Sequence, residues 1–410
     1  MSTNALFRPT FADLRAEIER RAAEGALTDE INALVEQFLS TGGDAPAPWV
    51  EYDGTVTWFY RDPDAETVAV VGDILGYDPD RTRMTRLPGS DLFALTAQMP
   101  LDAWIEYAFV VDHPRSDAER ATGWAAWLNH CKTDPLNPRQ IVEVTPARAL
   151  SVLEMPNARP MPELEDAFGD AIASVAYQLV SSPDGTIWAR VWVFLPQNYD
   201  PDERRYPTLY LLDGEAYLIS ARAPQMMDAL ISQGEASPAI LVFVQRAERT
   251  DGTEDRLDGK FVQFLADDLV PWVDARYATS TDPLERVIGG AGYNATLSLY
   301  TTLERPHVFG QALAQSPVAR SFVKAVPVLL ARNAARGFGP PQCYIDVGRY
   351  ETPAVLESVH TLCTVLLNGG AAVSYQEFGG GHSFLGWRTT LPDALRFHFS
   401  APALFASGID

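Results

Sequence analysis

Lysine, cysteine and long apolar runs are all scarce in this sequence of 410 residues. The only lysines are Lys132, Lys260 and Lys324, and the formal net charge is −22. Because such an acidic surface repels phosphate groups, we expect no binding to nucleic acid or to an anionic membrane surface. No run of about 18 apolar residues occurs, so no membrane-spanning helix is expected.

The cysteines, Cys131, Cys343 and Cys363, form neither a disulfide framework nor a CxxC metal-binding pattern. The N-terminal stretch mixes acidic residues among its arginines and lacks the apolar core of a signal peptide. The predicted location is therefore the cytoplasm. Hydrophobic residues at 47% and charged residues at 21% are typical of a soluble globular protein, and the length favours two or three domains.

In the first half of the chain, the spacing of apolar residues changes at a glycine- and proline-rich segment before Trp49. Apolar residues recur at helical spacing over residues 10–40, which predicts an amphipathic helix or a helix pair. After this glycine- and proline-rich segment, short apolar or alternating runs are separated by aspartate, proline and glycine, a pattern that favours a small all-β sandwich. We predict an N-terminal helical segment at residues 1–48 and a β-sandwich domain at residues 49–155.

From about residue 172, strand-like runs alternate with helix-length segments. This alternation predicts an α/β domain over residues 172–410, with a mostly parallel sheet covered by helices on both faces. Ligands bind such sheets at the carboxyl ends of the strands, so the loops there are the places to search. The predicted strands are 189–195, 208–212, 240–244, 286–290, 311–315, 342–347 and 373–378, and the clearest predicted helices are 261–276 and 354–367.

One of these strands runs through small residues straight into a helix, over residues 287–295 (VIGGAGYNA). This is the frame of a nucleophile elbow, G-x-S-x-G, in which a serine protrudes from a strained turn and is followed downstream by an acid and a histidine. Here the serine is absent. Aligning the apolar positions of the following helix places Gly292 at the nucleophile position, and the neighbouring register places Ala291 there. Neither residue can attack a carbonyl.

The downstream acid and histidine do have candidates. His382 follows three consecutive glycines after the last predicted strand, and Glu351 lies just past the strand that ends at Val347. These positions are typical of a general base and of the carboxylate that orients it. Asp346 or Glu357 could take the place of Glu351.

Several segments, in this order, resemble the enterochelin (ferric-enterobactin) esterase family. The resemblance implies an N-terminal β-sandwich lid domain and an esterase-D-like α/β-hydrolase domain. It also implies hydrolysis of ester bonds in catecholate siderophores through a serine acyl-enzyme, with no metal or other cofactor used in the chemistry. The segments are 58–63 (WFYRDP), 134–138 (DPLNP), 153–156 (LEMP), 211–215 (LLDGE), 304–306 (ERP) and 380–382 (GGH).

The resemblance also implies roles for individual residues. His382 is similar to the family's general base, and Glu351 is similar to the carboxylate that orients it. The backbone N–H of Tyr293, together with one from the Gly214–Glu215 loop, would form the oxyanion hole.

The sequence departs from the family in two places. The nucleophile maps to Gly292 and is missing. In the loop 251–261, where the family usually shows an arginine and an asparagine near the bound ligand, the best-matching residues are Asp251 and Asp258. An acidic loop disfavours a strongly anionic ferric catecholate complex by Coulomb repulsion. The predicted ligand contacts are the nearby arginines, Arg246, Arg249 and Arg256.

These observations favour an esterase homologue that binds a small-molecule ester or siderophore-like ligand with weak hydrolysis or none. Glycine accepts the backbone conformation of an elbow without a Cβ penalty, so the turn can persist after the hydroxyl is gone. Three alternatives stay open. The first is hydrolysis by water activated by His382 or by a displaced hydroxyl of Tyr293, Ser316 or Ser383. The second is a parent form with serine at position 292, and the third is a scaffold whose sandwich binds proteins. The oligomeric state is not predicted.

Overall fold

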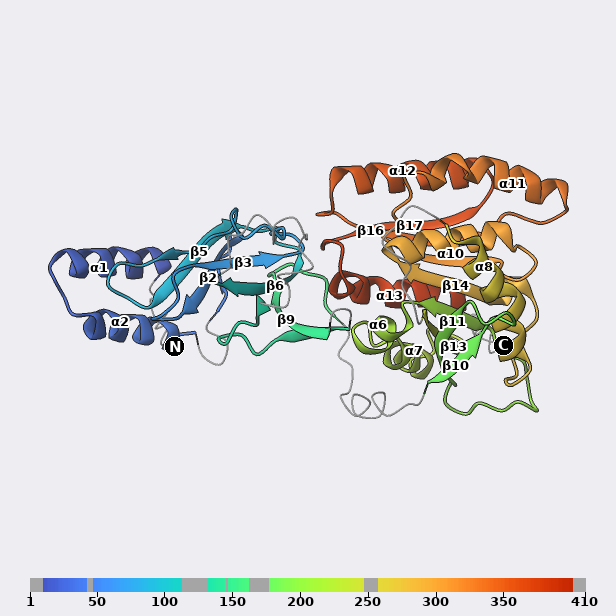
Figure 1. Cartoon of the computed structure of the whole chain (residues 1–410), viewed down its shortest axis with the longest axis horizontal. Helices are drawn as coiled ribbons and strands as arrows, with labels where there is room; N and C mark the ends of the chain where they lie inside the picture. The colour runs from blue at the N-terminus through green and yellow to red at the C-terminus, as the bar shows by residue number, and fades with distance from the viewer. Residues whose placement is uncertain are drawn as a thin grey trace, which may run out of the picture. The chain divides into compact units, whose positions relative to one another are not determined.

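The computed structural model describes residues 10–42, 47–112, 131–144, 147–161, 177–246 and 257–400 (Figure 1). The chain divides into two compact units, Met1–Arg159 and Pro160–Asp410. Among the described residues, no helix combines the length and the apolar character needed to cross a membrane.

The first unit contains two antiparallel sheets. One sheet, in the order β1-β2-β5-β4, consists of β1 (Trp49–Val50), β2 (Thr55–Arg61), β5 (Leu92–Gln98) and β4 (Thr85–Arg86). The other, in the order β3-β6-β9-β8, consists of β3 (Val68–Gly72), β6 (Trp104–Val111), β9 (Ala147–Glu154) and β8 (Gln140–Val144), with β7 (Cys131–Lys132) paired to β6.

Aromatic side chains of β2 and β6 join the two sheets face to face. The ring centroids of Trp58 and Tyr107 lie 6.2 Å apart, and those of Tyr60 and Phe109 lie 4.9 Å apart. Because side chains alternate along a strand, Trp58 and Tyr60 share the inner face of β2. The predicted all-β sandwich is confirmed.

The opposite face of β2 is covered by a helix pair, α1 (Phe11–Ala23) and α2 (Thr28–Ser40). Phe59, between the two inward-facing aromatics, contacts Phe11 at 5.1 Å and Phe38 at 5.9 Å between ring centroids. The helices and the sandwich therefore share one core. This explains why β2 is buried along its centre on both faces.

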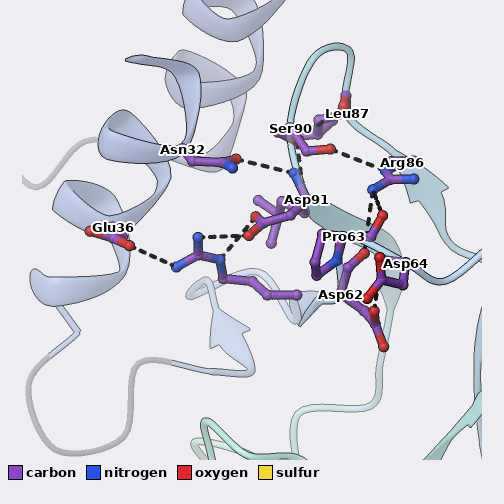
Figure 2. Close-up of polar contacts among 11 residues, drawn as sticks. Asn32, Glu36, Asp62, Pro63, Asp64, Arg86, Leu87, Ser90 and Asp91 are labelled. Atoms are coloured by element: carbon purple, nitrogen blue, oxygen red, sulfur yellow. Dashed lines mark hydrogen bonds and ion pairs between the residues drawn. The ribbon is translucent and has the colours of Figure 1, made fainter. Parts of the chain in front are cut away.

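Polar contacts fix α2 against the end of the same sheet (Figure 2). The backbone N–H of Asp91 donates to Asn32 Oδ1 at 3.1 Å, and the Asp91 carboxylate accepts from Arg61 at 3.0 and 2.8 Å. Arg61 also reaches Glu36 of α2 at 3.4 Å. Asp91, at the turn before β5, thus donates to α2 through its backbone and accepts from Arg61 of β2 through its side chain, which holds the helix against the sheet.

The second unit is built on an eight-stranded sheet in the order β10-β11-β13-β12-β14-β15-β16-β17. All pairings from β13 to β17 are parallel, and β10 and β11 are antiparallel additions at one edge. The predicted mostly parallel sheet is confirmed, with β10 an addition that the sequence analysis missed. The strands are β10 (Gln178–Ser181), β11 (Trp188–Phe194), β12 (Thr208–Leu212), β13 (Ile240–Arg246), β14 (Arg286–Ala291), β15 (Gln311–Gln315), β16 (Gln342–Gly348) and β17 (Ala372–Phe378).

Helices cover both faces of this sheet (Figure 1). One face packs against α6 (Gly214–Ile219), α7 (Ala223–Ser232) and α13 (Phe384–Phe399). The other packs against α8 (Gly259–Gln263), η3 (Phe264–Leu269), α9 (Val270–Asp274), α10 (Gly292–Glu304), α11 (Val326–Ala335) and α12 (Pro353–Asn368). Two short 3₁₀ segments, η4 (Pro283–Glu285) and η5 (Phe322–Lys324), also belong to the described part of this unit.

The predicted helix at 261–276 consists of three segments rather than one. Its central part, η3, is a π-helix, and Pro271 follows in the first turn of α9. Proline lacks an N–H and disrupts regular α-helical hydrogen bonding, and a wider π turn accommodates such an interruption. The apolar spacing alone did not reveal this change.

Candidate active site

The carboxyl ends of the parallel strands bring the predicted loops to one edge of the sheet. The loop at Asp213 follows β12, Gly292 follows β14, Glu351 follows β16, and His382 follows β17. In parallel sheets this edge is where ligands bind. The site is therefore built by four separate segments, each of which follows a buried strand.

The chain passes from β14 to α10 without an intervening loop. Ala291 is extended, with φ −117° and ψ 153°, and Gly292 has a positive φ of 55°. Residues with a Cβ rarely adopt this region, which glycine enters without that steric cost. The turn position is therefore Gly292 and not Ala291, which resolves the two registers left open by the sequence.

The His382 imidazole lies between the turn and a buried carboxylate. Its Nδ1 is 2.7 Å from Glu351 Oε2. Its Nε2 lies 2.9 Å from the position that an ideal Cβ on Gly292 would occupy. The side chain of His382 is 41% exposed, and that of Glu351 is 1% exposed. The structure thus brings together the three residues that the sequence predicted as base, acid and nucleophile position.

Glu351 is fixed from several directions. Its Oε1 accepts hydrogen bonds from the Gly348 N–H at 3.0 Å and from Ser316 Oγ at 2.5 Å, and its Oε2 faces the imidazole. Of the alternatives, Asp346 is fully buried and bonded elsewhere, and Glu357 is exposed on α12. The geometry therefore selects Glu351 as the partner of His382.

Asp346 belongs to a buried polar network behind the site. Its Oδ2 accepts from Thr390 Oγ1 at 2.6 Å and from Gln315 Nε2 at 3.1 Å, and Gln315 in turn accepts from the Tyr217 hydroxyl at 2.8 Å. Burial raises the pKa of Asp346 to about 7, and the charge of Glu351 adds to the rise. This network links α6, β15, β16 and α13 beneath the imidazole.

The residues after β15 have a structural role that their sequence does not reveal. Ser316 Oγ donates to Glu351 and accepts from Trp387 Nε1 at 2.8 Å, so it lies on the carboxylate side of His382. This placement disfavours the hypothesis that Ser316 replaces the lost nucleophile, because its hydroxyl is hydrogen-bonded to Glu351 and to Trp387.

Two helix starts carry the predicted oxyanion donors. Tyr293 is the second residue of α10, and Gly214 and Glu215 are the first two residues of α6. The first N–H groups of a helix have no acceptor within that helix. Asn294 Nδ2 donates to Asp213 Oδ1 at 2.7 Å, which ties these two helix starts to each other.

The Gly214 loop is packed closely on the neighbouring strand. A Cβ on Gly214 would lie 2.5 Å from the backbone nitrogen of Val244, so a side chain at this position would displace the loop. The next residue, Glu215, pairs with Arg190 of β11 at 2.8 Å. The close approach of Gly214 to β13 and the ion pair of Glu215 with β11 hold the start of α6 against these two strands.

Of the predicted ligand-binding arginines, Arg246 is described, whereas Arg249 and Arg256 lie outside the described residues. Arg246 ends β13, and its Nη1 lies 2.8 Å from Asp258 Oδ2. Asp258 also caps α8, accepting from the N–H groups of the next helical turn. Although burial acts to raise it, hydrogen bonds from Arg246 and the backbone hold the pKa of Asp258 below its usual value. Arg246 is therefore already paired.

Among the described residues, no group of three or more histidine, cysteine, aspartate and glutamate side chains is placed to hold a metal ion.

Comparison with known proteins identifies relatives for both units. Residues 188–398 match the family described as "Putative esterase", and residues 55–164 match the family described as "Enterochelin esterase, N-terminal". The uncharacterized protein YjcH of Bacillus subtilis is 26% identical over 218 residues, 50% of this chain and 88% of that protein. The iron(III) salmochelin esterase of Escherichia coli is 23% identical over 335 residues, 77% of this chain and 80% of that enzyme.

A solved structure extends the likeness to the fold. The enterobactin esterase of Shigella flexneri, crystallised in the presence of enterobactin, matches with a TM-score of 0.67 and 23% identity, over 84% of this chain and 92% of that one. The same enzyme was also crystallised in the presence of 2,3-dihydroxy-N-benzoyl-serine. The predicted α/β-hydrolase fold preceded by a β-sandwich is thereby confirmed.

Proposed function

The chain belongs to the putative esterase family, and its first unit matches the N-terminal domain of enterochelin esterases. From this premise we propose that it binds a small-molecule ester in an esterase site that no longer forms an acyl-enzyme efficiently. The observation that carries the proposal is the glycine at the turn between β14 and α10. Gly292 has the backbone conformation of an elbow residue but no attacking atom.

The surrounding residues support an acyl-transfer ancestry. In a serine hydrolase, a hydroxyl attacks the ester carbonyl, an imidazole takes its proton, a carboxylate orients the imidazole, and two N–H groups stabilise the oxyanion. The contact between His382 and Glu351 fits the imidazole–carboxylate half of this arrangement. We assign the oxyanion donors to the N–H of Tyr293 and to one from the Gly214–Glu215 loop.

Catalysis without the hydroxyl is expected to be slow. Loss of the serine nucleophile lowers turnover by about 10⁶-fold in a comparable hydrolase. The oxyanion donors and substrate binding retain about 10³–10⁴-fold acceleration over water in such enzymes. The proposed activity of this chain is therefore ligand binding with residual hydrolysis at most.

The proposed ligand is a siderophore-like ester, in keeping with the salmochelin and enterobactin esterases to which the chain is similar. Because Arg246 is paired with Asp258, an anionic ligand must compete with that carboxylate for the guanidinium. A less strongly charged ester than a ferric catecholate complex suits this site better. The contacts of Arg249 and Arg256 stay predictions.

The test compares the unsubstituted protein with Gly292→Ser and Gly292→Ala, using p-nitrophenyl acetate hydrolysis and labelling by a fluorophosphonate probe. Gly292→Ala is the matched control, because it adds the Cβ and the backbone strain without the hydroxyl. We expect Gly292→Ser alone to hydrolyse the ester rapidly and to become labelled. This result would also fit a parent form with serine at position 292.

Two outcomes would count against the proposal. Rapid hydrolysis or covalent labelling of the unsubstituted protein would show that an acyl-enzyme forms without a residue-292 hydroxyl. A folded Gly292→Ser protein with no gain over Gly292→Ala would contradict the roles assigned to His382 and Glu351.

A further inference from the structure

Ser316 has an unusual backbone conformation for a buried serine. It follows β15 directly, has a φ of 49°, and is 0% exposed. A non-glycine residue in this region is strained and persists where the surrounding structure fixes it. The hydroxyl of this residue should therefore make contacts that glycine could not.

Those contacts involve two residues that touch the imidazole. Ser316 Oγ donates to Glu351 Oε1 at 2.5 Å and accepts from Trp387 Nε1 at 2.8 Å. Glu351 contacts His382 Nδ1 at 2.7 Å, and the Trp387 ring packs edge-to-face on the imidazole, with centroids 5.0 Å apart at 82°. One hydroxyl thus connects the two groups that limit rotation of the histidine ring.

We propose that Ser316 is a positioning residue, which holds the Glu351 carboxylate and the Trp387 indole in the arrangement that aims His382 Nε2 at the turn. It acts through these two neighbours and does not touch the reacting atoms. The kinetic part of this inference rests on the proposed function of the site, whereas the structural part does not.

The neighbouring residue strengthens the same link. Gln315 Nε2 donates to the backbone carbonyl of Trp387 at 2.9 Å, in the first turn of α13. The indole of Trp387 is therefore fixed through its side chain by Ser316 and through its backbone by Gln315. Both residues lie at the end of β15, so this strand sets the position of the aromatic ring against His382.

The kinetic test adds Ser316→Ala and Ser316→Gly to the Gly292→Ser protein. Ser316→Gly removes the hydroxyl and also relieves the backbone strain, so it keeps the test valid if Ser316→Ala folds poorly. The matched control is Ser298→Ala, another fully buried serine, whose hydroxyl donates to the backbone carbonyl of Asn294 at 2.7 Å.

We expect both Ser316 variants to lower kcat by about 10- to 100-fold with KM within about twofold, because a hydrogen bond to a charged group is lost. Ser298→Ala should keep kcat within about twofold. If the Ser316 variants retain the kcat of the Gly292→Ser protein, or match the loss of the control, the inference is overturned.

The structural test uses the unsubstituted protein and needs no activity. The hydrogen-bonded Nδ1 proton of His382 and the indole proton of Trp387 are followed by NMR in the unsubstituted protein, Ser316→Ala and Ser316→Gly. We expect both resonances to move or broaden by exchange in the variants and to be unchanged in Ser298→Ala. Unchanged resonances in a folded Ser316 variant would overturn the inference. If Gly292→Ser gains no hydrolysis, the proposed function fails and this measurement alone decides the role of Ser316.

Discussion

His382 Nε2 lies 2.9 Å from the position that a Cβ atom on Gly292 would occupy. This distance is shorter than ordinary contacts of a real Cβ, so the imidazole extends into space that a side chain at the turn would need. The glycine therefore does two things: it relieves the strain of a positive φ, and it lets the ring approach the backbone of the turn.

Gly292→Ala should consequently lower the free energy of unfolding by about 1–3 kcal/mol, because alanine is strained at this φ and its Cβ forces the imidazole to shift. Urea denaturation at constant m-value measures the change. Gly259→Ala is the control, since a Cβ on Gly259 would have open space around it and no positive φ. Equal stability of the two variants would show that the turn is not strained.

The identity of the orienting acid can be tested in the Gly292→Ser protein. Glu351→Gln should lower kcat by about 10⁴-fold, as loss of the orienting carboxylate does in other triads. Glu357→Gln, on the exposed face of α12, should leave kcat within about twofold. A large loss for Glu357→Gln with little loss for Glu351→Gln would reverse the assignment.

The sequence predicted the strands and the elbow well because both depend on local patterns. The run of small residues before Gly292 lies between an apolar strand and an apolar helix face, and each of these has its own period. The same patterns could not distinguish Glu351 from Asp346, since both lie at or beyond the end of one strand. That choice depends on contacts between distant loops: the Tyr350 N–H donates to the Gly380 carbonyl at 3.1 Å and brings the two loops together.

Burial patterns explain the other differences. The sequence around Phe59 predicts an apolar strand. It does not predict that the Phe59 ring packs on helices some twenty or more residues earlier in the chain. Ser316 likewise carries no motif, because its importance arises from Glu351 and Trp387, which are brought to it by β16 and α13.

The buried Asp346 should make stability depend on pH. Burial raises its pKa from 3.8 to about 7, so between these values the native state binds more protons than the unfolded state. The contribution of Asp346 to the free energy of unfolding therefore falls as pH rises from about 4 to about 7. Asp346→Asn removes this titrating group. The free energy of unfolding of the variant, relative to that of the unsubstituted protein, should therefore increase by about 1–4 kcal/mol as pH rises from about 4 to about 7.

Unfolding free energies measured at several pH values between 4 and 8 would check this prediction. The control is Asp282→Asn, which removes an exposed carboxylate before the amino end of β14, the opposite end of that strand from Gly292. A difference between Asp346→Asn and the unsubstituted protein that stays constant with pH would mean that Asp346 does not titrate in this range.

The pairing of Arg246 with Asp258 should weaken the binding of anionic ligands. Asp258→Asn removes the competing charge and keeps a residue that caps helices well, so α8 should persist. With 2,3-dihydroxy-N-benzoyl-serine as the probe, isothermal titration calorimetry should show a Kd lower by about two- to fivefold, since the pair is partly exposed. The gain should shrink as salt is added, because salt screens the attraction between the probe and the freed guanidinium.

The control is Asp282→Asn, which makes the same change in net charge at another capping aspartate, before the amino end of β14 and away from the site edge. If both variants improve binding equally, net charge alone is responsible, and if Asp258→Asn changes nothing, Arg246 does not contact the ligand.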